Sequence, residues 1–363
     1  MIPGQFFYAD MKRSFFLLLI YFICSCQPTP REERSHKVSN EIAIAPALVT
    51  QKVANDSDDP AIWINRKDPG NSLVVGTDKG DDAGAGALYV FNLRGEIVDT
   101  VNNIMRPNNV DIAYDFDFNS ERIDIAVCTE RYSNSIRVFR LPEMTPIDNG
   151  GIPVFEGDSL NAPMGVALYT DHASDRIFAI VGRKYGPQTG YLWQYKLHTD
   201  NQSVKGTRVR AFGNFSGKKE IEAIAVDNEQ GYVYYADEGV GVRKYYAHPD
   251  SSDTELALFA REGFTDDHEG ISIYKSSDST GYLLVSDQQA NKFHIYPREG
   301  TSNNPHDHPV LKTVLLSTLE SDGSEVTSAG LNDTFKQGLF VAMSDDGTFQ
   351  FYKWEDIAGE DLK

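Results

Sequence analysis

The chain has 363 residues, of which 34 are basic and 53 are acidic, and its formal net charge at neutral pH is −19. This excess of acid argues against a nucleic-acid-binding protein, and it requires that an anionic ligand be met by bound cations or by a local basic cluster. Glycine (29) and proline (16) interrupt the chain frequently, and no long stretch has the helical period. We therefore expect strands joined by turns.

The N-terminus is typical of an exported protein. The basic residues Lys12 and Arg13 precede the apolar run 15–23, which is too short for a comfortable transmembrane span. The string ICSC, which ends at Cys26, fits a bacterial lipoprotein cleavage box. We predict a lipoprotein signal peptide over residues 1–26, with Met11 as an alternative start, and anchoring at the outer membrane of a bacterium through this lipid alone. A plain secretory peptide is the alternative.

Residues 27–40 are polar and lack an apolar pattern, which is typical of a flexible tether. Residues 41–363 then form one domain, which we expect to be a monomer. Without the signal peptide only Cys26 and Cys128 remain, so no disulfide framework is possible. Cys128 lies in an apolar run and is expected to be a buried thiol.

Six short turns along the chain each lead into an apolar strand, with no recognisable helix between them. Aligned on the residue two before each strand, they lie 50, 54, 58, 47 and 56 residues apart. This period predicts an all-β fold, a six-bladed β-propeller over residues 41–363. Later in each repeat an alternating tract, such as GALYVFNL (86–93), is expected to close the blade. The six strings are DDPAIW (58–63), NNVDIAY (108–114), PMGVALY (163–169), IEAIAV (221–226), HEGISIY (268–274) and SEVTSAG (324–330), and the aligned residues are Pro60, Val110, Met164, Glu222, Glu269 and Glu325.

The turns carry acids and amides that could bind a metal. Because propeller blades are radially equivalent, we expect a ring of carboxylates on the axial channel, with Glu222, Glu269 and Glu325 at equivalent positions. Calcium binds oxygen ligands, and carboxylates gathered on one axis repel unless they bind metal or protons. Alternatively these side chains only make turns, although glutamate is a poor turn residue. The candidate ligands are Asp58, Asp59, Asn108, Asn109, Asp111, Glu222, Glu238, Asp267, Glu269, Gln288, Asp322 and Glu325.

Basic residues follow an apolar strand in each of the first three repeats: Lys79, Arg131, and the pair Arg183 and Lys184. Together they should form a cationic arc on one rim, opposite the carboxylates of the later repeats. Such cations bind phosphate oxygens. Since no serine, cysteine or histidine nucleophile pattern is evident, water activated by bound calcium is favoured over a covalent intermediate.

At these residues the chain resembles the β-propeller phytases, calcium-dependent phosphatases of the 3-phytase type. The resemblance runs in order from about Asp56 to the C-terminus. It implies hydrolysis of phosphomonoesters of myo-inositol hexakisphosphate (phytate), a small-molecule substrate bound as its calcium complex. The matching strings include DDPAIW, GTDK (76–79), NNVDIAYDF (108–116), YYADEGVGVRKY (234–245), GYLLVSDQ (281–288) and KWEDIA (353–358).

The resemblance also implies metal ligands. Asp59, with the backbone carbonyls of Pro60 and Val110, would hold a structural calcium, and Asp322 matches a further acid of the family. The calcium ions that bind phosphate and activate water would be held by Asp58, Glu222, Glu238, Asp267, Glu269 and Gln288.

Substrate contacts are implied in the same way. Lys79, Arg131 and Lys184 would contact the phosphates and, with Glu222 and Glu269, act in catalysis. The cationic arc adds Arg183 as a candidate for substrate binding.

The chain departs from the family at four places. Met164 stands where the family often has tyrosine, and Tyr185 stands where an acid often follows the lysine. The loop 344–349 is short, and the family's second acid after Asp322 is replaced near Ser328. Two other functions stay open. A calcium-dependent propeller lactonase or esterase would need no cationic arc, and a non-catalytic binding propeller would show calcium-dependent stability without turnover.

Overall fold

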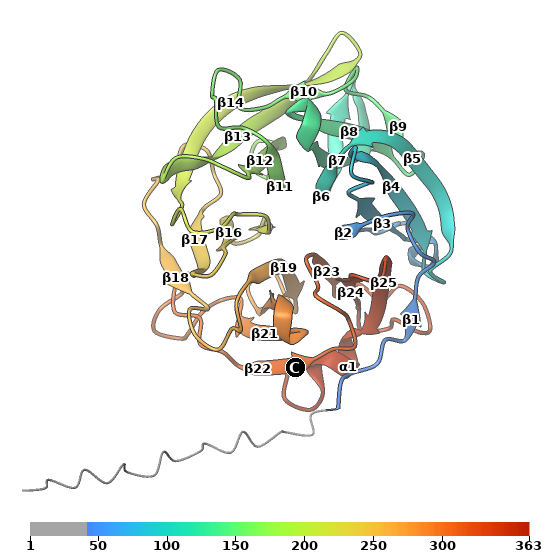
Figure 1. Ribbon diagram of the computed structural model, residues 1–363, viewed down its shortest axis with the longest axis vertical. Helices are drawn as coiled ribbons and strands as arrows, with labels where there is room; N and C mark the ends of the chain where they lie inside the picture. The colour runs from blue at the N-terminus through green and yellow to red at the C-terminus, as the bar shows by residue number, and fades with distance from the viewer. Residues whose placement is uncertain (1–41, 363) are drawn as a thin grey trace, which may run out of the picture. The chain divides into compact units, whose positions relative to one another are not determined.

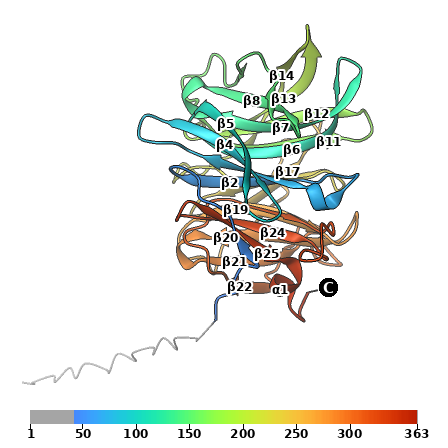
Figure 2. The ribbon, with the colours of Figure 1, turned by 90° about the vertical axis from the view of Figure 1, so that its right-hand side faces the viewer.

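The computed structural model describes residues 42–362, which belong to one compact unit. Six antiparallel sheets surround a central axis (Figure 1), and Figure 2 shows the same ring from the side. The predicted all-β class and six-bladed propeller are confirmed. The predicted signal peptide (1–26) and tether (27–40) lie outside the described residues. Among residues 42–362, no helix combines the length and apolar character that a membrane span requires.

In the first three blades the strands run outward from the axis in chain order. Blade 1 consists of β2 (Ser57–Trp63), β3 (Leu73–Asp78), β4 (Ala85–Asn92) and β5 (Ile97–Met105). Blade 2 consists of β6 (Pro107–Phe118), β7 (Glu121–Glu130), β8 (Ser135–Leu141) and β10 (Ile152–Pro153), with β9 (Thr145–Pro146) also paired to β8. Blade 3 consists of β11 (Pro163–Asp171), β12 (Arg176–Arg183), β13 (Thr189–Asp200) and β14 (Ser203–Asn214).

Blades 4 and 5 follow the same order, and short helical turns connect some strands. Blade 4 consists of β15 (Ile224–Asp227), β16 (Tyr232–Asp237), β17 (Gly241–Tyr246) and β18 (Ala257–Phe259). Blade 5 consists of β19 (His268–Lys275), β20 (Gly281–Asp287), β21 (Lys292–Pro297) and β22 (Lys312–Leu315). The helical turns are the 3-10 segments η1 (Pro69–Asn71), η2 (Arg131–Ser133) and η3 (Gln288–Ala290), and the α-helix α1 (Trp354–Ala358) follows the last strand.

Blade 6 closes the ring with strands from both ends of the described chain. Its outer strand, β1 (Leu48–Val49), pairs with the third strand through Leu48 opposite Phe351. The backbone N–H of Phe349 also donates a 2.9 Å hydrogen bond to the hydroxyl of Thr50, 299 residues earlier. The other strands of this blade are β23 (Ser324–Thr327), β24 (Leu339–Ser344) and β25 (Thr348–Lys353).

The six predicted strings lie at the inner strands of the six blades, as expected. The alternating tracts do not close the blades, however. They form the third strands, and a fourth, outer strand follows in blades 1 to 5. The outer strands escaped prediction because some are only two or three residues long, such as β10 and β18, while β5 is largely exposed and lacks alternation.

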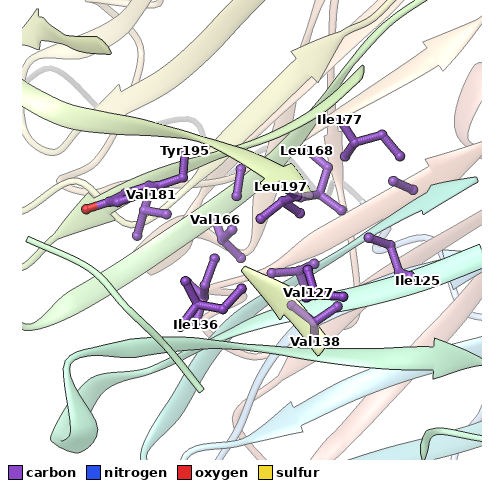
Figure 3. Close-up of a cluster of buried hydrophobic side chains, with 14 of the residues drawn as sticks. Ile125, Val127, Ile136, Val138, Val166, Leu168, Ile177, Val181, Tyr195 and Leu197 are labelled. Carbon is purple, nitrogen blue, oxygen red and sulfur yellow. The ribbon is translucent and has the colours of Figure 1, made fainter. Parts of the chain in front are cut away.

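The hydrophobic core lies between the blades rather than within any one of them. Buried apolar side chains form six clusters, one at each interface between adjacent blades. Figure 3 shows the cluster between blades 2 and 3, where Val127 and Val138 meet Val166 and Leu168. Successive residues of a strand face opposite interfaces. Cys128 accordingly faces blade 1 and is a fully buried free thiol, as predicted.

The pairing of inner and second strands shows which residues are equivalent between blades. Four of these pairings contain a bulge shortly after the inner strand begins. A bulge inserts a residue that the apolar pattern does not reveal. The equivalent pairs beyond it are Pro60–Gly76, Val110–Cys128, Val166–Val181, Ile224–Tyr235, Ile271–Val285 and Ser324–Ala342.

This register corrects the alignment made from the sequence. Glu222 and Glu269 are equivalent, as predicted. Glu325 is not their equivalent, because it lies three residues further along its strand and corresponds to Asp111. The residues aligned in blades 1 and 2 are displaced by two positions. The side chains that ring the mouth of the axial channel are therefore not the set that we aligned from the sequence.

Candidate metal and phosphate site

Four positions in each blade lie where the inner strand begins and the second strand ends, and we name them from the equivalent pairs. The loop position lies four residues before the first member of each pair, and from blade 1 to blade 6 it holds Asp56, Arg106, Ala162, Glu220, Asp267 and Glu320. The inner position lies two residues before that member, and it holds Asp58, Asn108, Met164, Glu222, Glu269 and Asp322. The anchor position is the last residue of the second strand, and in the same order it holds Asp78, Glu130, Arg183, Asp237, Asp287 and Ser344. The outer position is the next residue, and it holds Lys79, Arg131, Lys184, Glu238, Gln288 and Asp345.

A repeated backbone hydrogen bond joins the loop and outer positions. The N–H of Lys79 donates to the carbonyl of Asp56 at 2.8 Å, and the N–H of Glu238 donates to the carbonyl of Glu220 at 3.3 Å. Blades 2, 3 and 5 form the same bond. The two positions of a blade are therefore held side by side by the backbone, whatever side chains they carry.

The inner positions converge across the channel. The side-chain amide of Asn108 donates to Asp58 at 3.0 Å and to Glu222 at 2.9 Å, so it joins blades 1, 2 and 4. All three side chains are buried. Burial raises the pKa of Asp58 well above its usual range, and the charge of Glu222 raises it further, although Lys79 acts in the opposite direction.

Lys79 lies among three carboxylates. Its ammonium nitrogen is 3.0 Å from Asp322, 3.5 Å from Asp58 and 3.9 Å from Asp56. Burial alone would lower the pKa of Lys79, but these acids together with Glu222 raise it above its usual value. Lys79 therefore carries its charge at the point where blades 1 and 6 meet.

Blade 4 contributes the densest group of acids. Carboxylate oxygens of Glu220, Glu222 and Glu238 lie within 4.8 Å of one another. Burial, followed by the charges of Glu220 and Glu222, raises the pKa of Glu238 to about 9. Burial and then Glu238 also raise the pKa of Glu269, from blade 5, well above its usual range.

The remaining predicted ligands of blades 5 and 6 lie beside this group. The amide of Gln288 donates to Asp322, the same carboxylate that Lys79 contacts. Asp267 lies nearer the rim, where its carboxylate accepts a hydrogen bond from Lys219. Asp267 is thus paired with a lysine, as Asp322 is with Lys79.

The donor set fits a hard divalent cation. Carboxylate oxygens of Asp58, Glu238 and Glu269 and the amide oxygen of Asn108 are buried and have no hydrogen-bond partner among the described residues. Such oxygens are costly unless something satisfies them. Calcium binds six to eight oxygens of these types, and it would supply the missing partner to ligands that come from blades 1, 2, 4 and 5.

Asp59 belongs to a second environment, deeper along the axis. With Pro60 and Val110 it lines an axial cavity of about 550 Å³. Its carboxylate accepts a 3.1 Å hydrogen bond from the N–H of Val110, and burial raises its pKa well above the usual range. Gly323 of blade 6 approaches so closely that a Cβ there would lie 2.5 Å from the Asp59 Cα atom. The three residues expected to hold a structural calcium thus line one cavity.

Asp111 and Glu325 line the same cavity. Burial raises the pKa of Asp111 to about 6 and that of Glu325 to about 8. Because both project into the channel below the inner positions, Glu325 is separated from the ring in which we expected it.

The other two predicted cations also lie at this mouth. Lys184 forms a 3.0 Å ion pair with Glu220 of the next blade. A guanidinium nitrogen of Arg131 contacts the sulfur of Met164. Met164 is buried and occupies the one inner position without an oxygen or nitrogen donor. Blades 1 to 3 therefore present cations at their outer positions, as expected.

Arg183 does not belong to this arc, contrary to our expectation. Its guanidinium is fully buried, lies 2.7 Å from Asp158, donates to the carbonyl of Leu160 at 2.6 Å and faces the ring of Phe155 at 4.6 Å. Because Arg183 ends a strand and Lys184 follows it, their side chains project in different directions. It is an anchor residue, which holds the loop that enters its blade.

Other anchor residues also hold the loop that enters their blade, but they accept hydrogen bonds where Arg183 donates them. Asp78 accepts a 2.9 Å hydrogen bond from the N–H of Asp56, Asp237 accepts one from Ser216, and Asp287 accepts one from Thr265. Anchor residues thus set the path of the loops, and the outer residues that follow them line the mouth.

The match to known proteins settles the family. A model described as phytase matches residues 16–359 of this chain. The chain belongs to the phytase family. It is 28% identical over 346 residues to a 3-phytase of Bacillus subtilis, covering 90% of this chain and 86% of that relative. Among solved structures it is similar to a calcium-binding protein, regucalcin, from Agrobacterium tumefaciens, with a TM-score of 0.52 and 8% identity, covering 85% of this chain and 94% of that one. At this identity the second likeness shows the fold alone.

In this phytase-family chain the sequence reasoning missed most loop positions. Asp56 and Glu220 contact the site, yet only Asp267 was named among the candidates. A signal was present, because each lies two residues before an inner acid. The strings D-x-D at 56–58, E-x-E at 220–222 and D-x-E at 267–269 all place two carboxylates on one side of an extended segment.

Proposed function

We propose that this protein is a calcium-dependent phytase, a phosphoric monoester hydrolase that releases phosphate from myo-inositol hexakisphosphate. The observation that carries the proposal is that equivalent blade positions hold cations in one half of the ring and oxygen ligands in the other. Blades 1 to 3 place Lys79, Arg131 and Lys184 at the mouth, and blades 4 and 5 place Glu238 and Gln288 at the same positions. Membership of the phytase family supports the substrate class.

The charge of the substrate explains why both halves are needed. Each phosphate carries about −1.5 to −2 near neutral pH, so the hexakisphosphate carries roughly −9 to −12. A chain with a net charge of −19 repels this ligand unless positive charge is concentrated at the site. Bound calcium would supply that charge and would lower the pKa of a water molecule that it coordinates.

The residues of this chain have distinct roles in the proposal. Lys79, Arg131 and Lys184 bind and orient phosphate oxygens. Asp59, with Pro60 and Val110, would hold one calcium within the axial cavity. The carboxylates and amides at the mouth would hold the others: Asp58, Glu222, Glu238, Asp267, Glu269, Gln288 and Asp322.

A phosphate-release assay tests the proposal. We expect inorganic phosphate to appear when the full chain is incubated with phytate and calcium, and release to stop when EGTA is added. Chelation should also lower the melting temperature, because a metal that binds only the native state stabilises it by mass action. Absence of phosphate release with calcium, combined with hydrolysis of lactones or carboxylic esters, would instead support the lactonase or esterase alternative.

We also propose that the protein is exported and anchored by a lipid on Cys26. The basic start, the apolar run and the ICSC string support this. Metabolic labelling with a radioactive fatty acid should mark the wild-type protein and not the Cys26→Ser variant. Equal labelling of both would contradict the anchor.

A further inference from the structure

The loop, inner and outer positions of one blade form a triad of neighbouring side chains. In blade 4 this triad consists of three glutamates whose oxygens lie within 4.8 Å of one another. In blade 1 the ammonium of Lys79 lies 3.5 Å from Asp58 and 3.9 Å from Asp56. The three positions therefore converge in blades of quite different chemistry, so their closeness follows from the backbone register rather than from one set of side chains.

Blade 2 carries nitrogen donors at all three positions: Arg106, Asn108 and Arg131. The N–H of Arg131 donates to the carbonyl of Arg106 at 3.1 Å, which is the bond that joins loop and outer positions elsewhere. The N–H of Arg106 in turn donates to the carbonyl of Gly84 at 2.7 Å, which fixes the loop against blade 1. Two guanidinium groups and an amide thus stand where blade 4 has three carboxylates.

These two arginines lack the carboxylate partners that the nearby lysines have. Within residues 42–362 neither guanidinium forms an ion pair, whereas Lys79 and Lys184 both do. The Nε of Arg131 is buried without a hydrogen-bond partner. Arg106 is close enough to act on the charge of Asp56, although no carboxylate oxygen within the described range comes within 4.0 Å of it. Partly buried guanidinium groups without counter-ions favour an oxyanion between or beside them.

We propose that Arg106 is a further substrate-binding residue, which with Arg131 forms a phosphate site on blade 2. The inference rests on the phytase function proposed above and deepens it. Arg131 binds one phosphate, and Arg106, on the loop before the inner strand, binds a neighbouring phosphate of the same molecule. The site therefore selects esters that carry several adjacent phosphates over simple monophosphates.

Two substrates separate this role from general catalysis. The Arg106→Gln variant of the full chain should lose roughly ten-fold in kcat/KM for phytate, mainly through KM, because a charged hydrogen-bonding partner of the substrate is removed. The loss for p-nitrophenyl phosphate, which has one phosphate, should be much smaller. Arg106→Lys should recover part of the loss, since lysine keeps the charge without the fork geometry.

The matched control is Arg140→Gln, which removes one positive charge from the same blade at a surface ion pair with Glu121. It should behave as wild type. Calorimetric titration with myo-inositol hexasulfate, a polyanion that carries no phosphate ester, gives a readout independent of turnover, and Arg106→Gln should bind it several-fold more weakly than the control. Equal kinetics and equal binding in Arg106→Gln and Arg140→Gln would overturn the proposal, as would equal losses for phytate and p-nitrophenyl phosphate.

The same titration separates this inference from the proposed function. If the wild-type protein released no phosphate from phytate while binding of the hexasulfate still depended on Arg106, the phytase function would fail and the anion site would stand.

Discussion

Blades 2 and 4 share the backbone hydrogen bond that joins the loop and outer positions, and they carry opposite charges at these positions. The three converging positions hold Arg106, Asn108 and Arg131 in blade 2 and three glutamates in blade 4. The comparison teaches that the propeller supplies geometry alone, and that the residue chosen at each position decides whether a blade meets an anion or a cation. An ester phosphate together with a divalent cation needs both kinds of blade in one ring.

The largest effect should come from removing the charge of the acidic half. Glu222→Gln and Glu269→Gln should each reduce phosphate release by about 100-fold or more, because each would remove a buried ligand of the proposed calcium. Both variants should melt at a higher temperature than wild type in EGTA, since a buried carboxylate that lies among other carboxylates is replaced by a neutral amide. Unchanged activity in both would remove these residues from the mechanism.

Changing the cationic half should have a smaller effect on activity and the opposite effect on stability. Lys79→Gln should lower kcat/KM by about 10- to 100-fold. In EGTA it should melt at a lower temperature than wild type, because Asp58 and Asp322 lose their neutralising partner. Differential scanning calorimetry with chelator measures this melting temperature. A rise in melting temperature, as expected for Glu222→Gln, would contradict the difference between the acidic and cationic halves.

The Arg183→Gln variant tests whether Arg183 lies outside the cationic half. It should destabilise the protein by about 2–4 kcal/mol, because Asp158 and buried carbonyls lose their donor. The activity of the protein that remains folded should stay within about two-fold of wild type. Urea unfolding and kinetics at low temperature test both statements. A large loss of kcat/KM without a loss of stability would return Arg183 to the substrate site.

The smallest expected effect is a dependence of stability on pH. Burial and the charges of Glu220 and Glu222 raise the pKa of Glu238 from its ordinary value of 4.5 to about 9 in the fold. Protonation of this group is therefore favoured by folding. The stability that it contributes is present below about pH 4.5 and is lost as the pH rises to about 9. In EGTA the melting temperature should fall between pH 6 and 9, and Glu238→Gln should reduce that slope. Equal slopes in both proteins would show that another group is responsible.

The sequence predicted the number of blades and named most of the residues that the structure brings together at the channel, but it did not predict the register. The period of the inner strands identified the propeller because each strand is an apolar run after a turn. The bulges that precede Pro60 and Val110 are invisible in that pattern, so the residues aligned in blades 1 and 2 are displaced by two positions. Glu325 was aligned with Glu222 although it lies deeper in the channel, on a strand whose pairing has no bulge. Strand pairing, which sequence alone does not show, was needed to correct this.

Arg183 shows a second limit of sequence reasoning. It adjoins Lys184, and composition gives no reason to separate the two. Only the alternation of side chains at the end of β12 sends one into the blade and the other to the mouth. A residue whose role depends on where its side chain points, rather than on its amino-acid type, is therefore the hardest to assign. Arg106 was overlooked for another reason, because one arginine before a strand has no distinctive pattern.

Closure of the ring by β1 has a consequence for how the molecule is made. The strand that completes blade 6 comes from the start of the described chain, and it pairs with a strand near its end. Loops this long are slow to close, and contacts between distant segments slow folding. A truncation that removes Leu48 and Val49 would leave β25 as a bare sheet edge, available to pair with other molecules. Loss of this two-residue strand should therefore cause self-association of the protein before the blades themselves unfold.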